Sequence, residues 1–196
     1  MKRIFDIFFS FLGLLLLSPL FLVVALWIKL DSRGPVFYRQ VRAGRGNRDF
    51  RIFKFRSMRV GSDKGSLVTI GGRDPRVTRS GYYIRKLKLD ELPQLINVLI
   101  GDMSFVGPRP EVRKYVDMYT PEQLHVLDVR PGITDEASIR YRNENELLAT
   151  AADPERFYIE TVMPDKLRIN LQYVQNHSLW GDIKLIFRTF AAVVGK

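Results

Sequence analysis

An almost unbroken apolar segment, residues Ile4–Ile28, constrains this chain more than any other feature of its sequence. At about 1.5 Å of rise per residue, a helix of this length reaches across a hydrocarbon core of about 30 Å. A cleaved signal peptide is disfavoured, because no small-residue cleavage site follows the segment. The segment therefore predicts a membrane helix.

Ser18 and Pro19 interrupt this segment near its middle. Proline removes a backbone donor and clashes with the preceding turn, so it kinks or breaks a helix. The residues alone leave two arrangements open: a kinked helix that spans the membrane, and a re-entrant helical hairpin that enters and leaves by the same face. Basic residues flank both ends and draw both to the cytoplasm; they are Lys2, Arg3, Lys29, Arg33, Arg39 and Arg42.

This charge bias divides the chain into a membrane segment, residues 1–30, and one cytosolic domain, residues 31–196. The net charge of +10 is concentrated next to the membrane segment, because residues 29–88 hold 17 basic and 4 acidic residues. Such a block binds either nucleic acid or an anionic membrane surface. Its position beside an apolar anchor favours the membrane, so we expect lipid contacts and no nucleic-acid partner.

The residue inventory restricts metal chemistry. The chain contains no cysteine and only two histidines, His125 and His177. Disulfides are therefore excluded and a zinc site is disfavoured. Magnesium, which prefers carboxylate and phosphate oxygens, stays open.

Alternation of apolar and polar residues predicts a small β-hairpin from residues 36–41 and 50–55, joined by a glycine-containing turn. Lys54 and Arg56 are expected on the strand face opposite Phe53 and Phe55, where the residues alone favour solvated charges. Residues 60–80 are typical of a surface loop. The predicted fold is α+β and predominantly helical.

Helices are predicted over residues 82–89, 91–100, 120–129 and 164–176, and another begins at Asp153–Pro154. The third begins with a capping box, Thr120 to Gln123, with proline at the first helical position. Apolar residues recur at helical spacing from Leu179 to Val194. This stripe suits either the domain core or an amphipathic helix in the membrane interface, and its tryptophan and basic face favour the interface.

The sequence Leu89-Asp90-Glu91-Leu92-Pro93 places two adjacent carboxylates at the expected start of a helix. An aspartate there has a sufficient structural role as an N-cap. The same position also suits chemistry, because a carboxylate can attack a phosphoryl group and helix amides favour anions. Arg109 lies nearby between two prolines, which restrict its backbone; it is either a solvent-exposed loop arginine or a pre-organised clamp for a diphosphate.

These motifs together resemble one family. Lys54-Phe55-Arg56-Ser57-Met58, Leu89 to Gln94, Gly101-Asp102-Met103-Ser104, Gly107 to Pro110 and Arg130-Pro131-Gly132-Ile133-Thr134 occur in the order found in bacterial sugar transferases. More narrowly, the chain is similar to the small monotopic phosphoglycosyl transferases. The resemblance covers nearly the whole chain and includes the Ser18–Pro19 break, so it favours the re-entrant hairpin.

The resemblance implies transfer of a sugar-1-phosphate from a UDP-sugar to undecaprenyl phosphate, with release of UMP. Asp90 is then the nucleophile that forms an aspartyl-phosphosugar, and Glu91 is the general base for the second half-reaction. Two like charges side by side raise one pKa unless a cation intervenes, which Mg²⁺ bound at Asp90 would supply. Ser18 and Pro19 shape the anchor, and Ser18 is placed to donate locally to the carbonyl that Pro19 leaves free.

The resemblance also implies substrate-binding roles. Arg109 would bind the diphosphate, Arg85 the polyprenyl phosphate, Lys54 a phosphate and Arg130 the nucleotide. The enzyme would start an envelope glycan or a glycoprotein glycan at the cytoplasmic face of the bacterial inner membrane. The oligomeric state stays open between a monomer and a homodimer, and the chain is expected to be the minimal catalytic unit.

One segment departs from the family pattern. Many relatives follow Pro-Gly-Ile-Thr with a small or aromatic residue and a glutamine-valine pair, whereas this chain continues Asp135 to Arg142. The donor sugar of other members therefore cannot be transferred to this chain. The alternative function is a non-catalytic, membrane-anchored basic module that binds anionic lipid or nucleic acid, and the Asp90–Glu91 pair argues against it.

Overall fold

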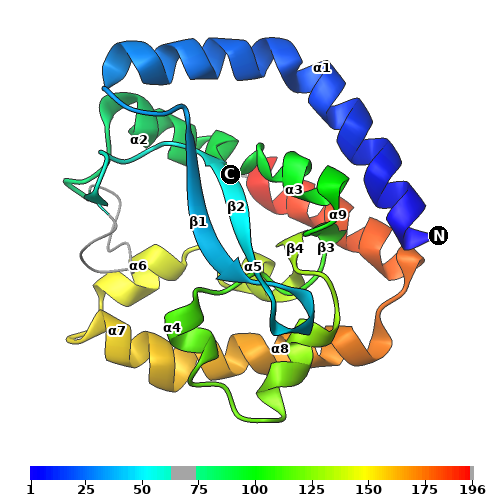
Figure 1. Ribbon diagram of the computed structural model, residues 1–196. Coiled ribbons are helices and arrows are strands. Elements are labelled where there is room, and N and C mark those ends of the chain that lie inside the picture. The colour runs from blue at the N-terminus through cyan, green and yellow to red at the C-terminus, as the bar shows by residue number, and fades with distance from the viewer. Residues whose placement is uncertain (63–73, 195–196) are drawn as a thin grey trace.

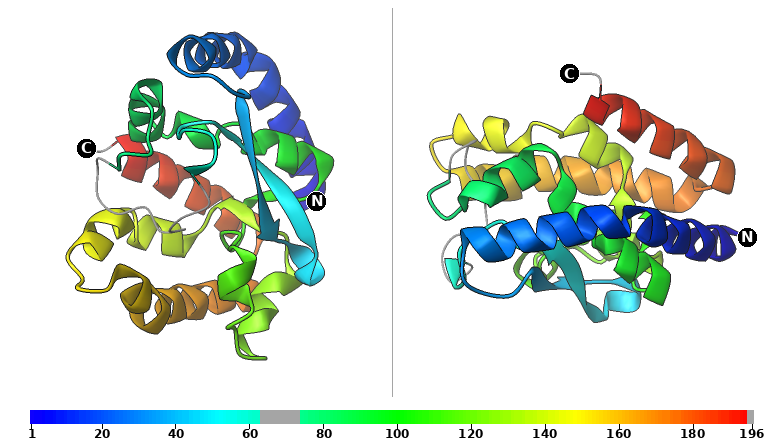
Figure 2. Two further views of the ribbon diagram at one scale, coloured as in Figure 1. Left: turned by 60° about the vertical axis from the view of Figure 1, so that its left-hand side comes forward. Right: turned by 90° about the horizontal axis from the view of Figure 1, so that it is seen from above.

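The computed structural model describes residues 1–62 and 74–194, and it confirms a mostly helical α+β fold. The long helix α1 (Lys2–Asp31) lies along one side of the molecule and α8 (Met163–Asn176) along the opposite side (Figure 1). The hairpin of β1 (Phe37–Ala43) and β2 (Asp49–Phe55) runs between them, as the left view of Figure 2 also shows.

Helix α1 is a single helix that bends near its middle, where it was expected to break into a helical hairpin (Figure 1). Pro19 lies inside it and has no N–H for the carbonyl of Leu15, four residues earlier. The Ser18 hydroxyl donates to that same carbonyl at 2.8 Å, as predicted for a local donor. Because the freed carbonyl is satisfied within the turn, the helix continues through the bend.

The N-terminal end of α1 is attached to the domain by buried polar contacts, which we name the N-terminal clasp. The Lys2 ammonium pairs with Asp182, a carboxylate that is only 2% exposed. Asp6, which is also buried, accepts a hydrogen bond from the Ser104 hydroxyl at 3.1 Å. Buried, partnered charges of this kind hold the helix end in one position.

The C-terminal end of α1 is attached to the same domain. The Asp31 carboxylate accepts hydrogen bonds from the Ser80 amide at 3.0 Å and from its hydroxyl at 2.8 Å. The Arg56 guanidinium donates to the Ser32 carbonyl at 2.8 Å, which satisfies a carbonyl that has no partner within the helix.

Beneath these contacts, α1 buries Ile28 in an apolar cluster that also contains Val24, Phe55 and Ile84.

The predicted β-hairpin is confirmed, with antiparallel pairing of β1 and β2 from Phe37–Phe55 to Ala43–Asp49. Its turn contains a short 3-10 helix, η1 (Arg45–Asn47), in which Gly46 has φ +65°. The expected surface loop contains an isolated bridge between Met58 and Val77. Its central part, residues 63–73, lies outside the described residues.

The two helices predicted around the carboxylate pair differ from their expected bounds: the first lies three residues earlier in the chain, and the second is three residues shorter. Helix α2 (Arg79–Lys86) ends before Lys88, whose left-handed φ of +56° stops the helix. A 3-10 turn, η3 (Leu89–Glu91), follows, and α3 (Gln94–Ile100) begins only after Pro93. The carboxylates therefore lie in a tight turn between two helices.

A short parallel pair, β3 (Ser104–Val106) with β4 (Gly132–Thr134), was not predicted from the sequence. Gly107 and Gly132 bring the two backbones very close, because a Cβ on Gly132 would lie 2.1 Å from the Gly107 nitrogen. Three-residue strands give too little alternation to detect. The pair matters because it places the Arg109 loop beside the segment that follows β4.

The C-terminal half packs helices around a second apolar core that includes Leu148, Tyr158, Val162 and Leu167. The capping box is confirmed by reciprocal bonds between Thr120 and Gln123, although the helix that follows is 3-10 rather than α. The remaining elements are α4 (Arg113–Val116), η4 (Gln123–Asp128), α5 (Glu136–Arg140), α6 (Glu144–Ala149), α7 (Pro154–Phe157), the π-helical turn η5 (Tyr158–Val162) and α9 (Leu179–Val194).

Candidate active site

A cavity of about 1300 Å³ connects the carboxylate turn with the concave side of α1. One part of its lining is apolar and comes from α1 and α9; it comprises Phe9, Gly13, Leu17, Ile186 and Phe190. The other part is polar and mainly basic; it comprises Arg42, Lys54, Arg59, Arg76, Arg85, Lys86, Lys88, Asp90, Glu91 and Arg109. The cavity therefore joins an anion-attracting region to a lipid-like one.

Asp90 and Glu91 face this cavity from the turn η3, and neither caps a helix. The expectation that Asp90 is an N-cap is wrong, because α3 begins after Pro93 and has no side-chain cap. Lys88, in the left-handed conformation, lies between the end of α2 and this turn. Among the described residues, Asp90 has no hydrogen-bond partner, which leaves its oxygens available to a substrate.

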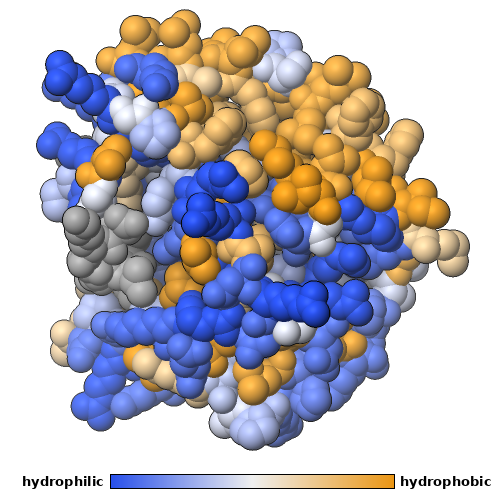
Figure 3. Space-filling view, viewed as in Figure 1, coloured by the Kyte–Doolittle hydropathy of each residue, from blue (hydrophilic) through white to orange (hydrophobic). Residues whose placement is uncertain are grey.

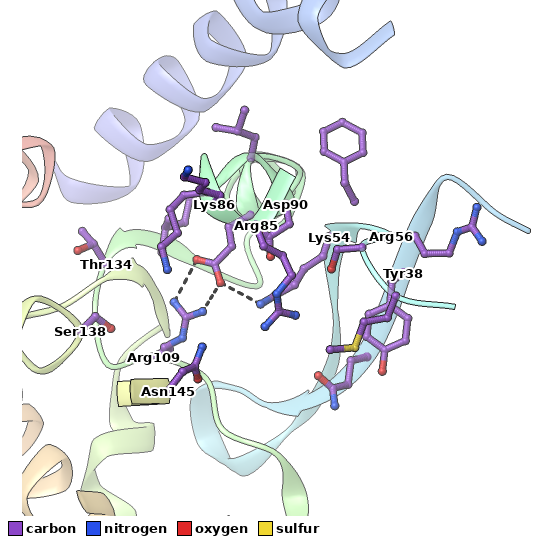
Figure 4. A pocket seen from close by; sticks show the side chains of 18 of the residues that line it. Tyr38, Lys54, Arg56, Arg85, Lys86, Asp90, Arg109, Thr134, Ser138 and Asn145 are labelled. Atoms are coloured by element: carbon purple, nitrogen blue, oxygen red, sulfur yellow. Dashed lines mark hydrogen bonds and ion pairs between the residues drawn. The ribbon is translucent and has the colours of Figure 1, made fainter. Parts of the chain in front are cut away.

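Glu91 forms ion pairs with two cations, Lys54 and Arg109, which point toward one another in the cavity (Figure 4). Lys54 donates to Glu91 Oε1 at 2.9 Å, and the Arg109 guanidinium contacts both Glu91 oxygens, with Nη1 3.2 Å from Oε2. Lys54 comes from β2 and Arg109 from the loop after β3, so three separate elements meet here. The structure thus brings together four of the predicted site residues, Asp90 included.

The neighbouring carboxylates have opposite pKa shifts. Burial, together with the charge of Glu91, raises the pKa of Asp90 against the opposing charge of Lys54. Burial also acts to raise the pKa of Glu91, but the charges and hydrogen bonds of Arg109 and Lys54 hold it well below its usual value. The predicted raising of one pKa in the pair therefore falls on Asp90.

The loop that carries Arg109 is held rigidly by main-chain contacts as well as by its two prolines. The Arg109 amide donates to the buried Asp135 carboxylate at 2.6 Å. On the other side of the loop, the Pro110 carbonyl accepts from Arg42 at 3.1 Å, and Arg42 pairs with Glu111. These contacts fix the guanidinium toward the cavity.

Asp135 and Arg42 were not singled out as site residues from the sequence. Asp135 begins the segment that departs from the family pattern, and its carboxylate also accepts from the Ser138 amide at the start of α5. The departure of this segment from the family pattern was the feature of the sequence that could have identified Asp135. The departing segment lines the cavity through Ser138, Ile139, Tyr141 and Arg142, so it lies where a donor substrate could contact it.

Of the two remaining residues that were predicted to bind substrate, Arg85 and Arg130, only the first lines the cavity. Arg85, at the end of α2, lines the cavity near the carboxylates. Arg130 does not line it, because its Nε donates to the Gly101 carbonyl at 2.8 Å. The structure therefore does not bring Arg130 together with the other cations.

The residues present fit a magnesium ion only in company with a substrate. No group of three or more acidic or histidine side chains suited to a metal occurs in the described part of the chain. Mg²⁺ is commonly held by one or two carboxylates and by substrate phosphates. The unpartnered Asp90 carboxylate is able to supply such a ligand.

Comparison with known proteins gives a consistent result. Residues 1–196 match the family model described as bacterial sugar transferase. A UDP-N-acetylgalactosamine-undecaprenyl-phosphate N-acetylgalactosaminephosphotransferase of Aeromonas hydrophila is 43% identical over an alignment of 196 positions that covers 98% of this chain and 43% of that protein. Two UDP-glucose:undecaprenyl-phosphate glucose-1-phosphate transferases are also similar. The one of Xanthomonas campestris is 39% identical over 200 residues, and the chain covers 39% of it.

The other, of Caulobacter vibrioides, is 38% identical over an alignment of 197 positions that covers 98% of this chain and 69% of that protein. The chain therefore spans about two fifths of the length of the first two relatives and about two thirds of the third. In all three, nearly the whole of this chain is matched.

Proposed function

The chain belongs to the bacterial sugar transferase family, and on that premise we propose that it transfers a sugar-1-phosphate from a UDP-sugar to undecaprenyl phosphate and releases UMP. The relatives act on these two substrates according to their names. One observation carries the proposal. The unpartnered carboxylate of Asp90 lies where a basic cavity for a sugar nucleotide meets the concave side of an apolar helix suited to a lipid.

In the first half-reaction, an Asp90 oxygen attacks the sugar-bearing phosphorus of the UDP-sugar. The bond from that phosphorus to the bridging oxygen breaks, and UMP leaves with the electron pair. Lys54 and Arg109 bind the phosphate oxygens on which negative charge develops. The product on the enzyme is an acyl phosphate that joins Asp90 to the phosphosugar.

In the second half-reaction, a phosphate oxygen of undecaprenyl phosphate attacks the same phosphorus, and the Asp90 carboxylate leaves. Glu91 accepts any proton that this phosphate still carries. With its pKa held low it is ionised but weakly basic in the free enzyme. When Arg109 and Lys54 turn to substrate phosphates, they stabilise the Glu91 charge less, and its basicity rises.

Magnesium fits the same proposal as a ligand of Asp90 and of the diphosphate. When bound, it would neutralise the charge that Asp90 and the substrate bring together. Arg85, at the cavity wall, supplies a cation for the lipid phosphate.

The attachment of both ends of α1 to one domain supports a re-entrant helix. The Lys2–Asp182 pair and the Asp31–Ser80 hydrogen bonds join the two ends to the same body. A straight spanning helix would place its ends on opposite faces, about 30 Å apart. We therefore assign both ends of α1, and the domain, to the cytoplasmic face of the bacterial inner membrane.

The exposed surface of the helices agrees with this placement. Apolar side chains cover α1, and a hydrophilic band lies beside it (Figure 3). On α9, Trp180, Phe187 and Phe190 are each about two-thirds exposed. An exposed apolar face on an amphipathic helix suits the membrane interface, so α9 is assigned there along with α1.

Release of UMP tests the proposal. The full chain in detergent or in nanodiscs should release UMP from its UDP-sugar only when Mg²⁺ is present, and should form an extractable lipid-linked sugar when undecaprenyl phosphate is added. A panel of UDP-sugars identifies the donor. A membrane-anchored binding module would release no UMP from any of them.

A further inference from the structure

A second, smaller cavity of about 250 Å³ lies behind the Arg109 loop. It adjoins the first cavity, because both are lined by the same five residues: Arg42, Arg109, Glu144, Asn145 and Lys166. Glu144 and Lys166 form an ion pair with 2.8 Å between Oε2 and Nζ. The second cavity is thus reached from the phosphate-binding region past this ion pair.

The wall of this cavity holds a side-chain oxygen that has no hydrogen-bond partner in the part of the chain that the structure describes. Asn170, on α8, is only 5% exposed, and its Oδ1 has no hydrogen-bond partner among the described residues. A buried amide without partners costs free energy unless something in the cavity pairs with it. The partner of this amide is either ordered water or a ligand that presents both a donor and an acceptor.

Aromatic side chains line the same small space. Tyr115, Tyr119 and Tyr158 belong to the wall together with Asn170. Aromatic rings stack on nucleobases, and amide side chains pair with the hydrogen-bonding edge of a base. The edge of uracil offers an N3–H donor between two carbonyl acceptors, which matches the acceptor Oδ1 and the donor Nδ2 of one asparagine.

We infer that this second cavity is the uracil subsite of the donor nucleotide, with Asn170 pairing with the N3 edge of the base. The inference rests on the proposed function, because it takes the donor to be a UDP-sugar. The Arg109 loop separates the two cavities, so Arg109 would hold the diphosphate on one side while the base occupies the other. The base would then be recognised in the second cavity, while the reacting phosphorus lies in the first.

Binding of UMP and N3-methyl-UMP to the detergent-solubilised full chain tests the inference by calorimetry. Methylation removes the N3 donor, so the parent should bind N3-methyl-UMP about tenfold to a hundredfold more weakly, as expected for one or two net hydrogen bonds. Asn170→Leu should weaken the binding of UMP by the same factor and abolish the difference in affinity between the two nucleotides. The matched control is Asn176→Leu, on the exposed end of the same helix, which should bind both as the parent does.

Equal binding of the two nucleotides by the parent would overturn the inference, as would a folded Asn170→Leu that still distinguishes them. Photocrosslinking with 5-iodo-UMP needs no variant. The adduct should form on Tyr115, Tyr119 or Tyr158, whereas an adduct confined to Tyr38 or Tyr141 of the first cavity refutes the subsite. UMP binding does not depend on turnover, so these outcomes are separate from a failure to release UMP.

Discussion

Arg109 and Glu91 form a two-pronged ion pair, in which Nη1 lies 3.2 Å from Oε2 and Nη2 contacts Oε1. The guanidinium thus binds the second carboxylate of the pair and leaves the first, Asp90, without a hydrogen bond among the described residues. Because Arg109 pairs with Glu91 and not with Asp90, these two adjacent carboxylates have different properties. Glu91 stays ionised and organises the cations, while Asp90 carries the raised pKa of an unpaired, partly buried carboxylate.

Asp90→Asn should abolish turnover, with a loss of about 10³-fold or more, because an amide cannot attack phosphorus. The fold should persist, since Asp90 caps no helix. Removing an unfavourable buried charge should also raise Tm by roughly 2–4 °C, the shift for about 1 kcal/mol in a chain of this size. Trapping of a labelled phosphosugar on another residue would refute the nucleophile assignment.

Glu91→Gln should slow the overall transfer strongly while still allowing some covalent adduct to form. The general base acts in the second half-reaction, so the labelled protein adduct should accumulate relative to the lipid product. Quantifying both products after a single turnover measures this. If the variant turns over at the parent rate, Glu91 has no role beyond the ion pairs of the free enzyme.

Arg109→Lys should lower activity about tenfold to a hundredfold although the charge is kept. A lysine cannot make two parallel contacts to a carboxylate or to a phosphate. The matched control is Arg113→Lys, whose guanidinium pairs with Asp49 on the exposed side of the domain. Unchanged kinetics in Arg109→Lys would reduce Arg109 to a structural partner of Glu91.

The rate of adduct formation should fall in acid with a midpoint above 3.8, the ordinary value for aspartate. Because the pKa of Asp90 is raised, its reactive ionised form is lost at a higher pH than usual, whereas Glu91, with a lowered pKa, stays ionised there. The ion pairs of Glu91 stabilise the fold fully at pH values above the pKa that Glu91 has in the unfolded state. This stabilisation is lost only as the pH falls through the lowered pKa that Glu91 has in the folded state. Rapid-quench measurement of the adduct against pH checks this, and an acid limb below 3.8 contradicts it.

The double variant Ser18→Ala, Pro19→Ala should restore the hydrogen bond from residue 19 to the Leu15 carbonyl and straighten α1. Part of the population should then expose its N-terminal end outside. A cysteine inserted after Met1, and in a second protein Ser62→Cys, can be labelled in intact cells, since the chain has no native cysteine. External labelling near Met1 in the parent would show a spanning helix.

Adding Asp182→Asn to this double variant should increase the externally exposed fraction. The change removes the anion that holds Lys2 and so weakens the N-terminal clasp. Asp182→Asn alone is the control, because the bend at Pro19 is retained there. An equal exposed fraction with and without Asp182→Asn would show that the clasp does not restrain α1.

The parts of the site that lie close together in sequence were predictable. The alternating residues of the hairpin placed Lys54 on a strand, and the carboxylate pair was recognised from its own motif. The Ser18 hydroxyl was also correctly predicted to satisfy the carbonyl freed by Pro19. Each of these depends on hydrogen-bond chemistry or periodicity within a few residues.

The long-range parts were not predictable in the same way. The pairing of β3 with β4 depends on two glycines 25 positions apart that allow close backbone approach, and no local pattern indicates this. The Asp135 contact with the Arg109 amide follows from that pairing. The helix start expected at Asp90 failed because a left-handed residue, Lys88, precedes it, and such a conformation is rare outside glycine and asparagine.

The Lys2–Asp182 ion pair joins residues that are 180 positions apart, and translation makes them at very different times. At about 5–20 residues per second, roughly 10–40 seconds separate the two. During that interval Lys2 lacks the Asp182 carboxylate, whereas the Asp6–Ser104 hydrogen bond of the N-terminal clasp joins residues only 98 positions apart and can form earlier. This ion pair therefore forms only after α9 has left the ribosome, so the N-terminal clasp is completed well after the first turn of α1 has been made.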